Sequence, residues 1–201
     1  MRERKTGREK EKNRKALWKP GNMLYPLPAV MVSCARPGEK PNVITVAWAG
    51  TVSSDPAMVS ISVRPGRYSY GIIRETGEFV INLVTEKLVR ACDWCGVKSG
   101  RDTDKFLEMH LTALPAETLA SAPLIGESPV NIECRVTQRI PLGSHEMFLA
   151  RVEAVHADEA YIDERGRFAL NETGLITYSH GEYYALGRKL GSFGYSVRKK
   201  R

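Results

Sequence analysis

Two short segments of this chain carry residue types that suit a flat, phosphorylated ligand. The first, Thr51-Val52-Ser53-Ser54-Asp55-Pro56, lies between two strand-like runs. Small hydroxyls and backbone amides can approach the polar edge of a planar ring closely, where large side chains would clash. Because Ser, Asp and Pro also favour plain turns, the composition alone leaves both interpretations open.

The second segment, Arg64-Pro65-Gly66-Arg67-Tyr68-Ser69, has the chemistry of a phosphate site. Arginine offers a planar fork of donors, Ser69 offers a hydroxyl, and free amides at a helix start attract anions. A solvated Arg-rich turn is the plainer alternative. The chain has no Gly-x4-Gly-Lys-Ser/Thr loop and no Gly-x-Gly-x-x-Gly run after a strand, so neither a Walker loop nor a nicotinamide-type Rossmann site is expected.

Other reactive residues are scattered. Cys92 and Cys95 form a Cys-x-x-Cys pair, which in other settings is a redox dithiol or half of a zinc site. No second ligand pair accompanies it, so we interpret both as structural thiols and predict no metal site. His145 begins a strand and is either a surface residue or a proton donor. Ser99 and Lys105 add a hydroxyl and a cation within a polar loop.

The elements that would position these residues are mostly strands. Alternation with a period of two places Ile44, Val46 and Trp48 on one face of a strand and Val43, Thr45 and Ala47 on the other. Thr45, Ala47 and Trp48 would supply the floor and side of a ring slot, with Trp48 more a core residue than a stacking partner. Further strands are expected at 27–35, 58–63, 78–84, 130–136, 147–156, 174–178 and 183–186.

Helices are few in this prediction. A short helix is expected at 69–76, capped by Ser69 and ended by Gly77, and another at 86–94. Along 130–136, Asn131, Glu133 and Arg135 are expected to point outward. Six or more strands with few helices predict a closed or sandwiched antiparallel β structure.

Charge is concentrated at the two ends. Residues 1–19 contain nine Lys or Arg and three Glu, and the last four residues are all basic, although the net charge of the whole chain is only +7. The middle is therefore net negative, by three charges. We expect a charged tail at 1–16, one folded domain at 17–197 and a basic tail at 198–201. Nucleic-acid binding through the tails is a weaker alternative.

No run approaches the length that spans a bilayer, and no signal peptide is recognisable. We therefore expect a cytoplasmic protein that does not use a membrane. In such a compartment disulfides are rare, so Cys34 and Cys134, which lie in apolar runs, are expected to be buried thiols.

Taken together, these segments resemble the flavin reductase-like family, and within it the flavoredoxin branch. The matching pieces run in family order from about Met23 to Val197: NVITVAWAGTVSSDPAMVSISVRPGRYSY, EFVINL, CGVKSGRDTDKF, APLI with SPVNIEC, LGSHEMFLARVEAVHADE and YYALGRKLGSFGYSV. The family commonly has two prolines after the Ser-Ser-Asp turn, where this chain has Pro56-Ala57.

The resemblance implies an FMN-binding split β-barrel with Greek-key strands, a homodimer, and FMN held without a covalent bond. Ring contacts would fall on Thr45, Ala47, Trp48, Thr51, Ser53 and Ser54. Phosphate contacts would fall on Arg64, Arg67, Ser69 and Lys105, with Asn82 and Ser99 as further candidates. His145 would lie near the reactive face of the flavin.

The function implied is that of an FMN-dependent oxidoreductase or electron carrier. Electrons would pass from NAD(P)H or a reduced ferredoxin-like protein through FMN to flavin, ferric iron or a protein partner. A non-catalytic flavin- or haem-binding protein on the same barrel is the alternative.

Overall fold

The computed structural model describes residues 15–198, and one antiparallel sheet dominates it. Its seven strands lie in the order β3-β2-β6-β9-β10-β5-β4. Their bounds are β2 (Val30–Cys34), β3 (Asn42–Val46), β4 (Ala49–Ser54), β5 (Ala57–Val63), β6 (Glu78–Leu83), β9 (Val130–Pro141) and β10 (Glu146–Ala157).

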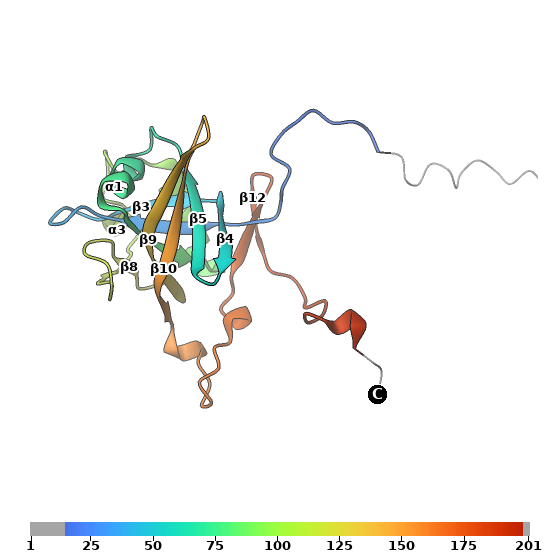
Figure 1. Ribbon diagram of the computed structural model, residues 1–201. Coiled ribbons are helices and arrows are strands. Elements are labelled where there is room, and N and C mark those ends of the chain that lie inside the picture. The colour runs from blue at the N-terminus through green and yellow to red at the C-terminus, as the bar shows by residue number, and fades with distance from the viewer. Residues whose placement is uncertain (1–14, 199–201) are drawn as a thin grey trace, which may run out of the picture.

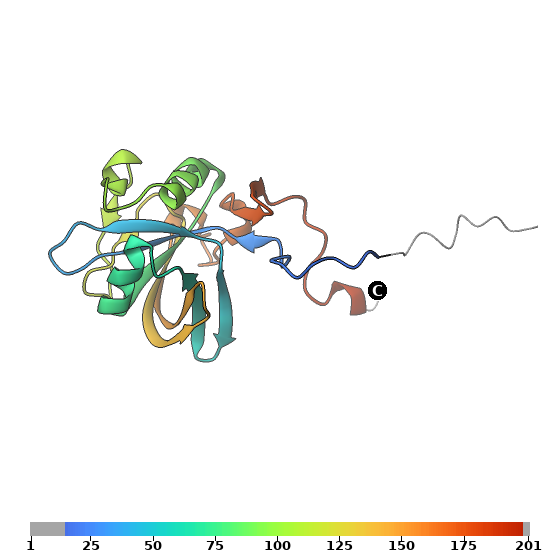
Figure 2. The same ribbon diagram turned by 90° about the horizontal axis from the view of Figure 1, so that it is seen from above.

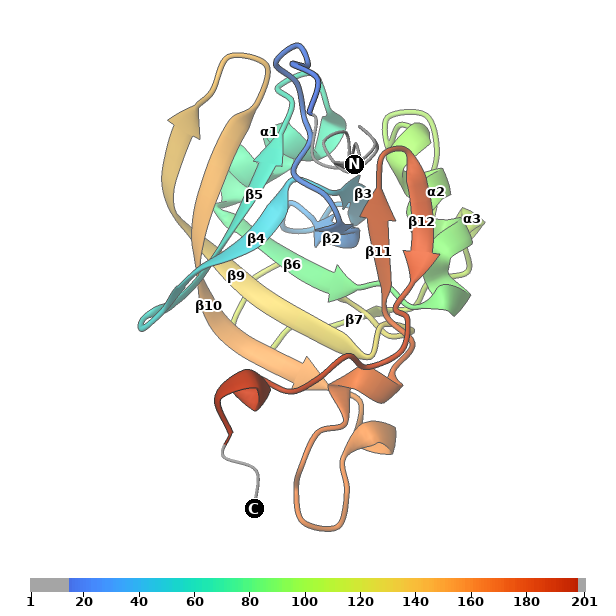
Figure 3. The ribbon, with the colours of Figure 1, turned by 90° about the vertical axis from the view of Figure 1, so that its right-hand side faces the viewer.

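The sheet curls into a half-barrel because its two edge strands are neighbours in the sequence (Figure 3). Only Ala47 and Trp48 join β3 to β4. The amide of Ser62 on β5 donates to the carbonyl of Trp48 at 2.8 Å, which brings the link against the far end of the sheet. The predicted all-β, antiparallel split-barrel architecture is confirmed.

Helices and two small sheets surround this barrel (Figures 1 and 2). The helices are α1 (Tyr68–Thr76), α2 (Val89–Val97) and α3 (Lys105–Glu108), with 3-10 turns η1 (Glu86–Leu88), η2 (Glu159–Tyr161), η3 (Leu170–Glu172) and η4 (Tyr195–Val197). One small sheet joins β1 (Leu27–Pro28), β11 (Ile176–Ser179) and β12 (Glu182–Ala185), and the other joins β7 (Ala113–Leu114) to β8 (Leu124–Ile125). No helix within residues 15–198 has both the length and the apolar character needed to cross a bilayer.

Two hydrophobic clusters lie on opposite sides of β2 and β3. Ile44 and Val46 point into the barrel with Phe79 and Phe148. Val43 points the other way, into a cluster with residues of α2. Both faces of β3 are therefore buried, which fixes the strand that carries Thr45. The alternation predicted for this strand is confirmed.

The second face of β9 is covered, contrary to the expectation that Asn131 and Glu133 point to solvent. Glu133 is fully buried. Its carboxylate accepts hydrogen bonds from the amides of Glu117 and Thr118, at 2.7 and 2.8 Å, and from the Thr118 hydroxyl at 2.5 Å. The segment before β8 packs over this face, and alternation within β9 carries no information about a segment elsewhere in the chain.

Two local predictions near the expected site are also wrong in detail. The cap residue of α1 is Arg67 and makes no side-chain cap bond, while Ser69 lies inside the helix. The helix does end at Gly77, as predicted, and this glycine has a left-handed conformation with φ 69°. Residues 51–54 are strand rather than turn, because the β4–β5 hairpin turns later, at Asp55-Pro56.

Candidate functional site

A groove of about 350 Å³ opens beside the link between β3 and β4. We call it the ring groove, because the predicted ring contacts Thr45, Ala47 and Trp48 line it. Six residues predicted from the sequence line it together: Thr45, Ala47, Trp48, Arg64, Arg67 and His145. The Trp48 and His145 rings stack with centroids 6.5 Å apart and 24° between their planes. Trp48 is only half-buried, so it lines the groove instead of filling the core as expected.

The register of β5 and β10 places His145 beside Arg64. Glu146, the first residue of β10, pairs with Val63, the last residue of β5, so the residues just outside this pair are neighbours. Burial and the nearby charge of Arg64 hold the pKa of His145 below its ordinary value. Its imidazole is therefore neutral near pH 7 and suited to donate or accept one hydrogen bond.

A second hollow, of about 240 Å³, adjoins the groove and shares Ile44 and Arg67 with it. We call it the phosphate hollow after the predicted phosphate contacts that line it. The predicted phosphate residues Arg67, Ser69, Ser99 and Lys105 all line it. The first turn of α1 also lines it, and the leading N–H groups of a helix have no partner within the helix. Arg64 lies in the ring groove and not in this hollow.

Lys105 is the most unusual group in this hollow. Its side chain is buried, with the residue only 3% exposed. The ammonium donates to the carbonyls of Val43 and Cys95, at 2.7 Å each, and no carboxylate of the described residues forms an ion pair with it. Burial lowers the pKa of Lys105. A buried cation without an anion is costly, and its third N–H remains available to an anionic ligand.

Close approach of three segments shapes the same hollow. The hydroxyl of Ser69 accepts a hydrogen bond from the Asn42 amide at 2.7 Å. Gly100 lies so near that an added Cβ would be 2.0 Å from Oδ1 of Asn42. Only glycine fits there, because the displaced atom belongs to a buried, hydrogen-bonded side chain. A small anion with a polar surround, such as a phosphate monoester, fits the donors that remain.

Four predicted contacts lie outside both hollows. Thr51, Ser53 and Ser54 are on β4, beyond the groove lining. Their contact with a ring stays a prediction. Asn82 is buried and occupied: its amide donates to Met31 and Ser33, and its oxygen accepts from Ile125 and Asn131. These bonds tie β6 to β2, β8 and β9, so the structure gives Asn82 a structural role.

Sequence reasoning missed two contributors. Tyr178, on β11, lines the ring groove although it follows Trp48 by more than a hundred residues in the sequence. A further hollow of about 220 Å³ continues from the groove between Trp48, Tyr178 and Tyr183. The missed signal is the aromatic character of β11 and β12, whose tyrosines pack with ring centroids 5.5 Å apart.

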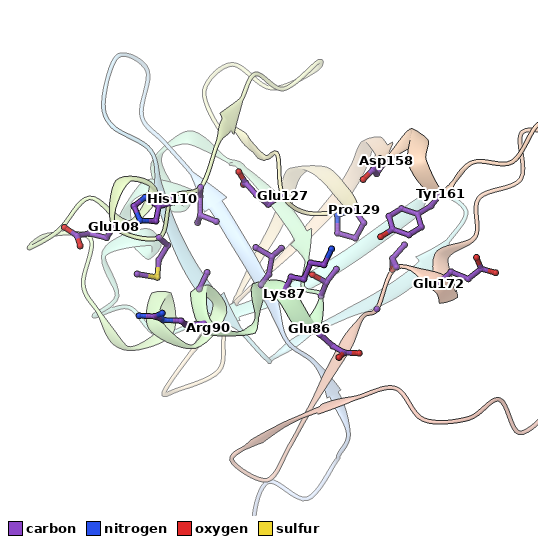
Figure 4. A pocket seen from close by; sticks show the side chains of 17 residues that line it. Glu86, Lys87, Arg90, Glu108, His110, Glu127, Pro129, Asp158, Tyr161 and Glu172 are labelled. Atoms are coloured by element: carbon purple, nitrogen blue, oxygen red, sulfur yellow. The ribbon is translucent and has the colours of Figure 1, made fainter.

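A larger hollow, of about 800 Å³, lies elsewhere and contains no predicted site residue. Figure 4 shows its side chains entering from η1, which carries Lys87, from α2, which carries Arg90, from the turn that carries Glu127 and from η2, which carries Tyr161. Its charged residues have both signs, and nearly all of them are exposed. Size alone therefore does not mark this hollow as the reactive site. The buried ammonium of Lys105, which has no ion-pair partner among the described residues, lies in the smaller phosphate hollow instead.

The Cys-x-x-Cys pair lies on α2 behind the phosphate hollow. Burial raises the pKa of Cys92 to about 12 and that of Cys95 to about 11. Little thiolate forms at neutral pH under these conditions. All four cysteines are buried free thiols, as expected for Cys34 and Cys134.

Comparisons with known proteins show the family and the fold of this chain. Residues 23–187 match the model of the flavin reductase like domain. The flavoredoxin of Desulfovibrio vulgaris (Miyazaki F) is 29% identical, with a TM-score of 0.84 over 92% of this chain and 100% of its own. An uncharacterized protein of Archaeoglobus fulgidus is 31% identical over 161 residues, which cover 80% of this chain and 88% of the relative.

A relative with a named activity is the NADPH-flavin oxidoreductase of Streptomyces viridifaciens. It is 29% identical over 140 residues, which cover 69% of this chain and 66% of that protein. The domain match covers most of this chain, and the solved flavoredoxin is superimposable over nearly all of the described part. The chain belongs to the flavin reductase-like family, in its flavoredoxin branch.

Proposed function

We propose that this protein binds FMN without a covalent bond and works as an FMN-dependent oxidoreductase or electron carrier. The observation that carries the proposal is the pairing of two hollows that share Arg67. One is a groove with a flat aromatic wall, and the other contains a buried ammonium that has no anionic partner within residues 15–198. FMN has a planar ring system and a phosphate, and it matches both.

In this proposal each side chain has a definite task. Lys105 and Arg67 hold the phosphate, together with the hydroxyls of Ser69 and Ser99 and the N-terminal amides of α1. Thr45, Ala47 and Trp48 form the floor and side of the ring slot. The bound flavin supplies the redox chemistry, and the chain positions it and tunes its potential.

His145 is proposed to act at the ring. One of its ring nitrogens, Nδ1, lies 2.9 Å from the Ser144 hydroxyl, so Nε2 is the atom left to face the groove. A neutral imidazole there holds a proton for a ring heteroatom without placing a fixed charge beside the flavin. Ring contacts from Thr51, Ser53 and Ser54 remain part of the proposal.

The electron donor we propose is NAD(P)H or a reduced ferredoxin-like protein, and the acceptor is flavin, ferric iron or a protein partner. The named activity of the Streptomyces viridifaciens relative supports a pyridine nucleotide as the donor.

We also propose a homodimer in the cytoplasm. Both described ends leave the barrel on the same side (Figures 1 and 2) and carry fully exposed apolar side chains, Leu17 and Phe193 among them. Apolar surface of this kind is typical of association sites.

Spectroscopy with defined donors tests the proposal. The purified protein, supplied with FMN, is expected to show flavin bands near about 375 and 450 nm. NADH, NADPH and reduced ferredoxin are then added anaerobically in turn, and bleaching at the longer wavelength is followed. Bleaching by one of them supports the oxidoreductase. Bound flavin that only dithionite reduces would instead indicate a storage or sensing protein.

Replacing the two arginines one at a time tests which of them holds the phosphate. Arg67→Ala is expected to weaken FMN binding about tenfold, since it removes a charge-assisted contact to phosphate. Arg64→Ala, which leaves the phosphate hollow intact, is expected to have a smaller effect. Equal affinities for the native protein and Arg67→Ala, measured by flavin fluorescence quenching, would remove Arg67 from the site.

A further inference from the structure

The hollow of about 220 Å³ beside Tyr183 has a chemistry of its own, and we call it the aromatic hollow. It shares Thr45, Ala47, Trp48 and Tyr178 with the ring groove and shares no residue with the phosphate hollow. Its walls come from segments far apart in the sequence, because β11 and β12 lie beside α2 (Figure 3). A ligand in this hollow therefore lies at the edge of the ring groove and away from the phosphate donors.

Three aromatic side chains line the aromatic hollow: Trp48, Tyr178 and Tyr183. The two tyrosine rings form a corner, with their centroids 5.5 Å apart and 59° between their planes. The face of an aromatic ring carries partial negative charge and attracts cations. Within residues 15–198 the one cation found over an aromatic ring is Arg101, on Tyr68. No cation of the described chain therefore occupies the three rings of the hollow.

A carboxylate completes this hollow. Asp93, on α2, is the single charged residue among those that line it, and it forms no ion pair within the described part of the chain. Its Oδ1 accepts a hydrogen bond of 3.3 Å from the Tyr183 hydroxyl. Burial first, with the charge of Asp93 among the further causes, raises the pKa of Tyr183, so this hydroxyl stays protonated and neutral. The hollow therefore has one negative charge and no positive charge.

The rest of the lining gives an anion nothing to bind. No lysine, arginine or histidine lines the hollow, and the other residues are small: Ala29, Ala47, Gly96, Val97 and Thr45. The Thr45 hydroxyl already donates to the Cys92 carbonyl. A neutral ring would contact the aromatic walls but leave the carboxylate without a partner. A small organic cation satisfies both, and a quaternary nitrogen is the type that aromatic walls bind best, because it is weakly hydrated.

We propose that the aromatic hollow is a binding site for a small organic cation with a quaternary nitrogen, held against Trp48, Tyr178 and Tyr183 with its charge towards Asp93. The site goes beyond the proposed function, because none of its walls depends on a bound flavin. When a ligand occupies the ring groove, the cation lies beside it, since Trp48 and Tyr178 line both spaces.

Two probes of the same shape separate charge from ring contact. N-methylpyridinium is a cation, and 4-methylpyridine is its neutral counterpart at slightly alkaline pH. Each is titrated into the isotope-labelled full-length chain, with and without FMN, and the amide NMR signals of Gly96 and Val97 report binding in the hollow. Asp93→Asn removes the charge and keeps the shape. Asp102→Asn, at an exposed position outside the hollow, is the matched control.

The native protein and Asp102→Asn are expected to bind N-methylpyridinium about tenfold more tightly than 4-methylpyridine. Asp93→Asn is expected to reduce this preference to within about threefold. Tyr183→Phe keeps the ring and is expected to retain the preference, whereas Tyr183→Leu removes the ring and is expected to weaken cation binding about fivefold.

Equal affinities of the native protein for the two probes, or a preference that Asp93→Asn leaves unchanged, would overturn the cation site. Asp93 is exposed, so its variant is expected to fold and to decide the question even if Tyr183→Leu does not. The titrations without flavin keep this result separate from the proposed function, which fails only if FMN does not bind.

Discussion

Replacing Lys105 with Met removes the buried charge from the phosphate hollow while nearly preserving the length of the side chain. Two of the three N–H donors of Lys105 are occupied by the carbonyls of Val43 and Cys95, each at 2.7 Å, which leaves one for a phosphate oxygen. A hydrogen bond to a charged group contributes about 1.5–3 kcal/mol. We therefore expect Lys105→Met to raise the dissociation constant of FMN about 10- to 100-fold.

Riboflavin provides the internal control, because it has the same ring without the phosphate. Apoprotein is titrated with FMN and with riboflavin, and quenching of flavin fluorescence gives both constants. Lys105→Met is expected to weaken FMN binding and leave riboflavin binding within about twofold. Lys98→Met, which removes an exposed cation from the rim of the same hollow, is the matched variant and is expected to have the smaller effect.

The variant also leaves the Val43 and Cys95 carbonyls without their donor, at a cost of about 1–3 kcal/mol for each buried group. Relief of the desolvated charge offsets part of this. A thermal melt is therefore recorded before the titrations. A folded Lys105→Met protein that loses FMN and riboflavin affinity equally, or that loses neither, would refute a role for Lys105 at the phosphate.

The pH dependence of binding follows from the same group. Burial lowers the pKa of Lys105, and a bound phosphate stabilises the charged ammonium, so binding raises this pKa. FMN affinity is therefore expected to fall as the pH rises through the lowered pKa of Lys105. That decline should be absent from riboflavin binding and from Lys105→Met. An identical decline for FMN and riboflavin would contradict the reasoning.

Three further substitutions test other parts of the structure. Gly100→Ala forces a Cβ to within 2.0 Å of Oδ1 of Asn42, and we expect a loss of about 1–3 kcal/mol of stability in a urea melt together with weaker FMN binding. Glu133→Gln weakens the bonds that hold the segment before β8, and a loss of about 2 kcal/mol is expected at pH 7. Burial alone would raise the pKa of Glu133, but its hydrogen bonds outweigh this effect and lower the pKa from 4.5 to about 2. The stability that Glu133 contributes is therefore present above its ordinary pKa and disappears as the pH falls towards 2. Urea unfolding of the native protein and of Glu133→Gln, compared at neutral and at low pH, checks this sign. His145→Gln is expected to slow flavin reduction by about tenfold or more in rapid-mixing kinetics, with little change in FMN affinity, and an unchanged rate would exclude a proton-transfer role.

The residues that line the phosphate hollow could be selected from the sequence because each has a chemical signature of its own. Arg67 and Ser69 lie within one short segment, and Lys105 follows a polar loop. Their meeting in one hollow depends on the packing of α1, α2 and α3 against β3, which residue types alone do not reveal. The resemblance to a family supplied that step. Gly100 has no local signature, since its requirement comes from Asn42 across the hollow.

The failed expectations share a physical cause. Alternation along one strand tells which residues face together, but it does not tell what covers each face. Glu133 is buried because residues 117–120 pack over it. The side-chain amide of Asn82 already forms hydrogen bonds with neighbouring strands. Thr51 to Ser54 read equally well as turn or strand, and the choice depends on pairing with β5. Trp48 is in the groove because it joins the two edge strands.

The most direct test of the account is a titration of the apoprotein with FMN, followed by absorbance and fluorescence and paired with a riboflavin titration. The account predicts saturation at about one FMN per chain and weaker binding of riboflavin, because the phosphate meets Lys105 and Arg67. Absence of saturable FMN binding, or riboflavin bound as tightly as FMN, would contradict the assignment of the two hollows.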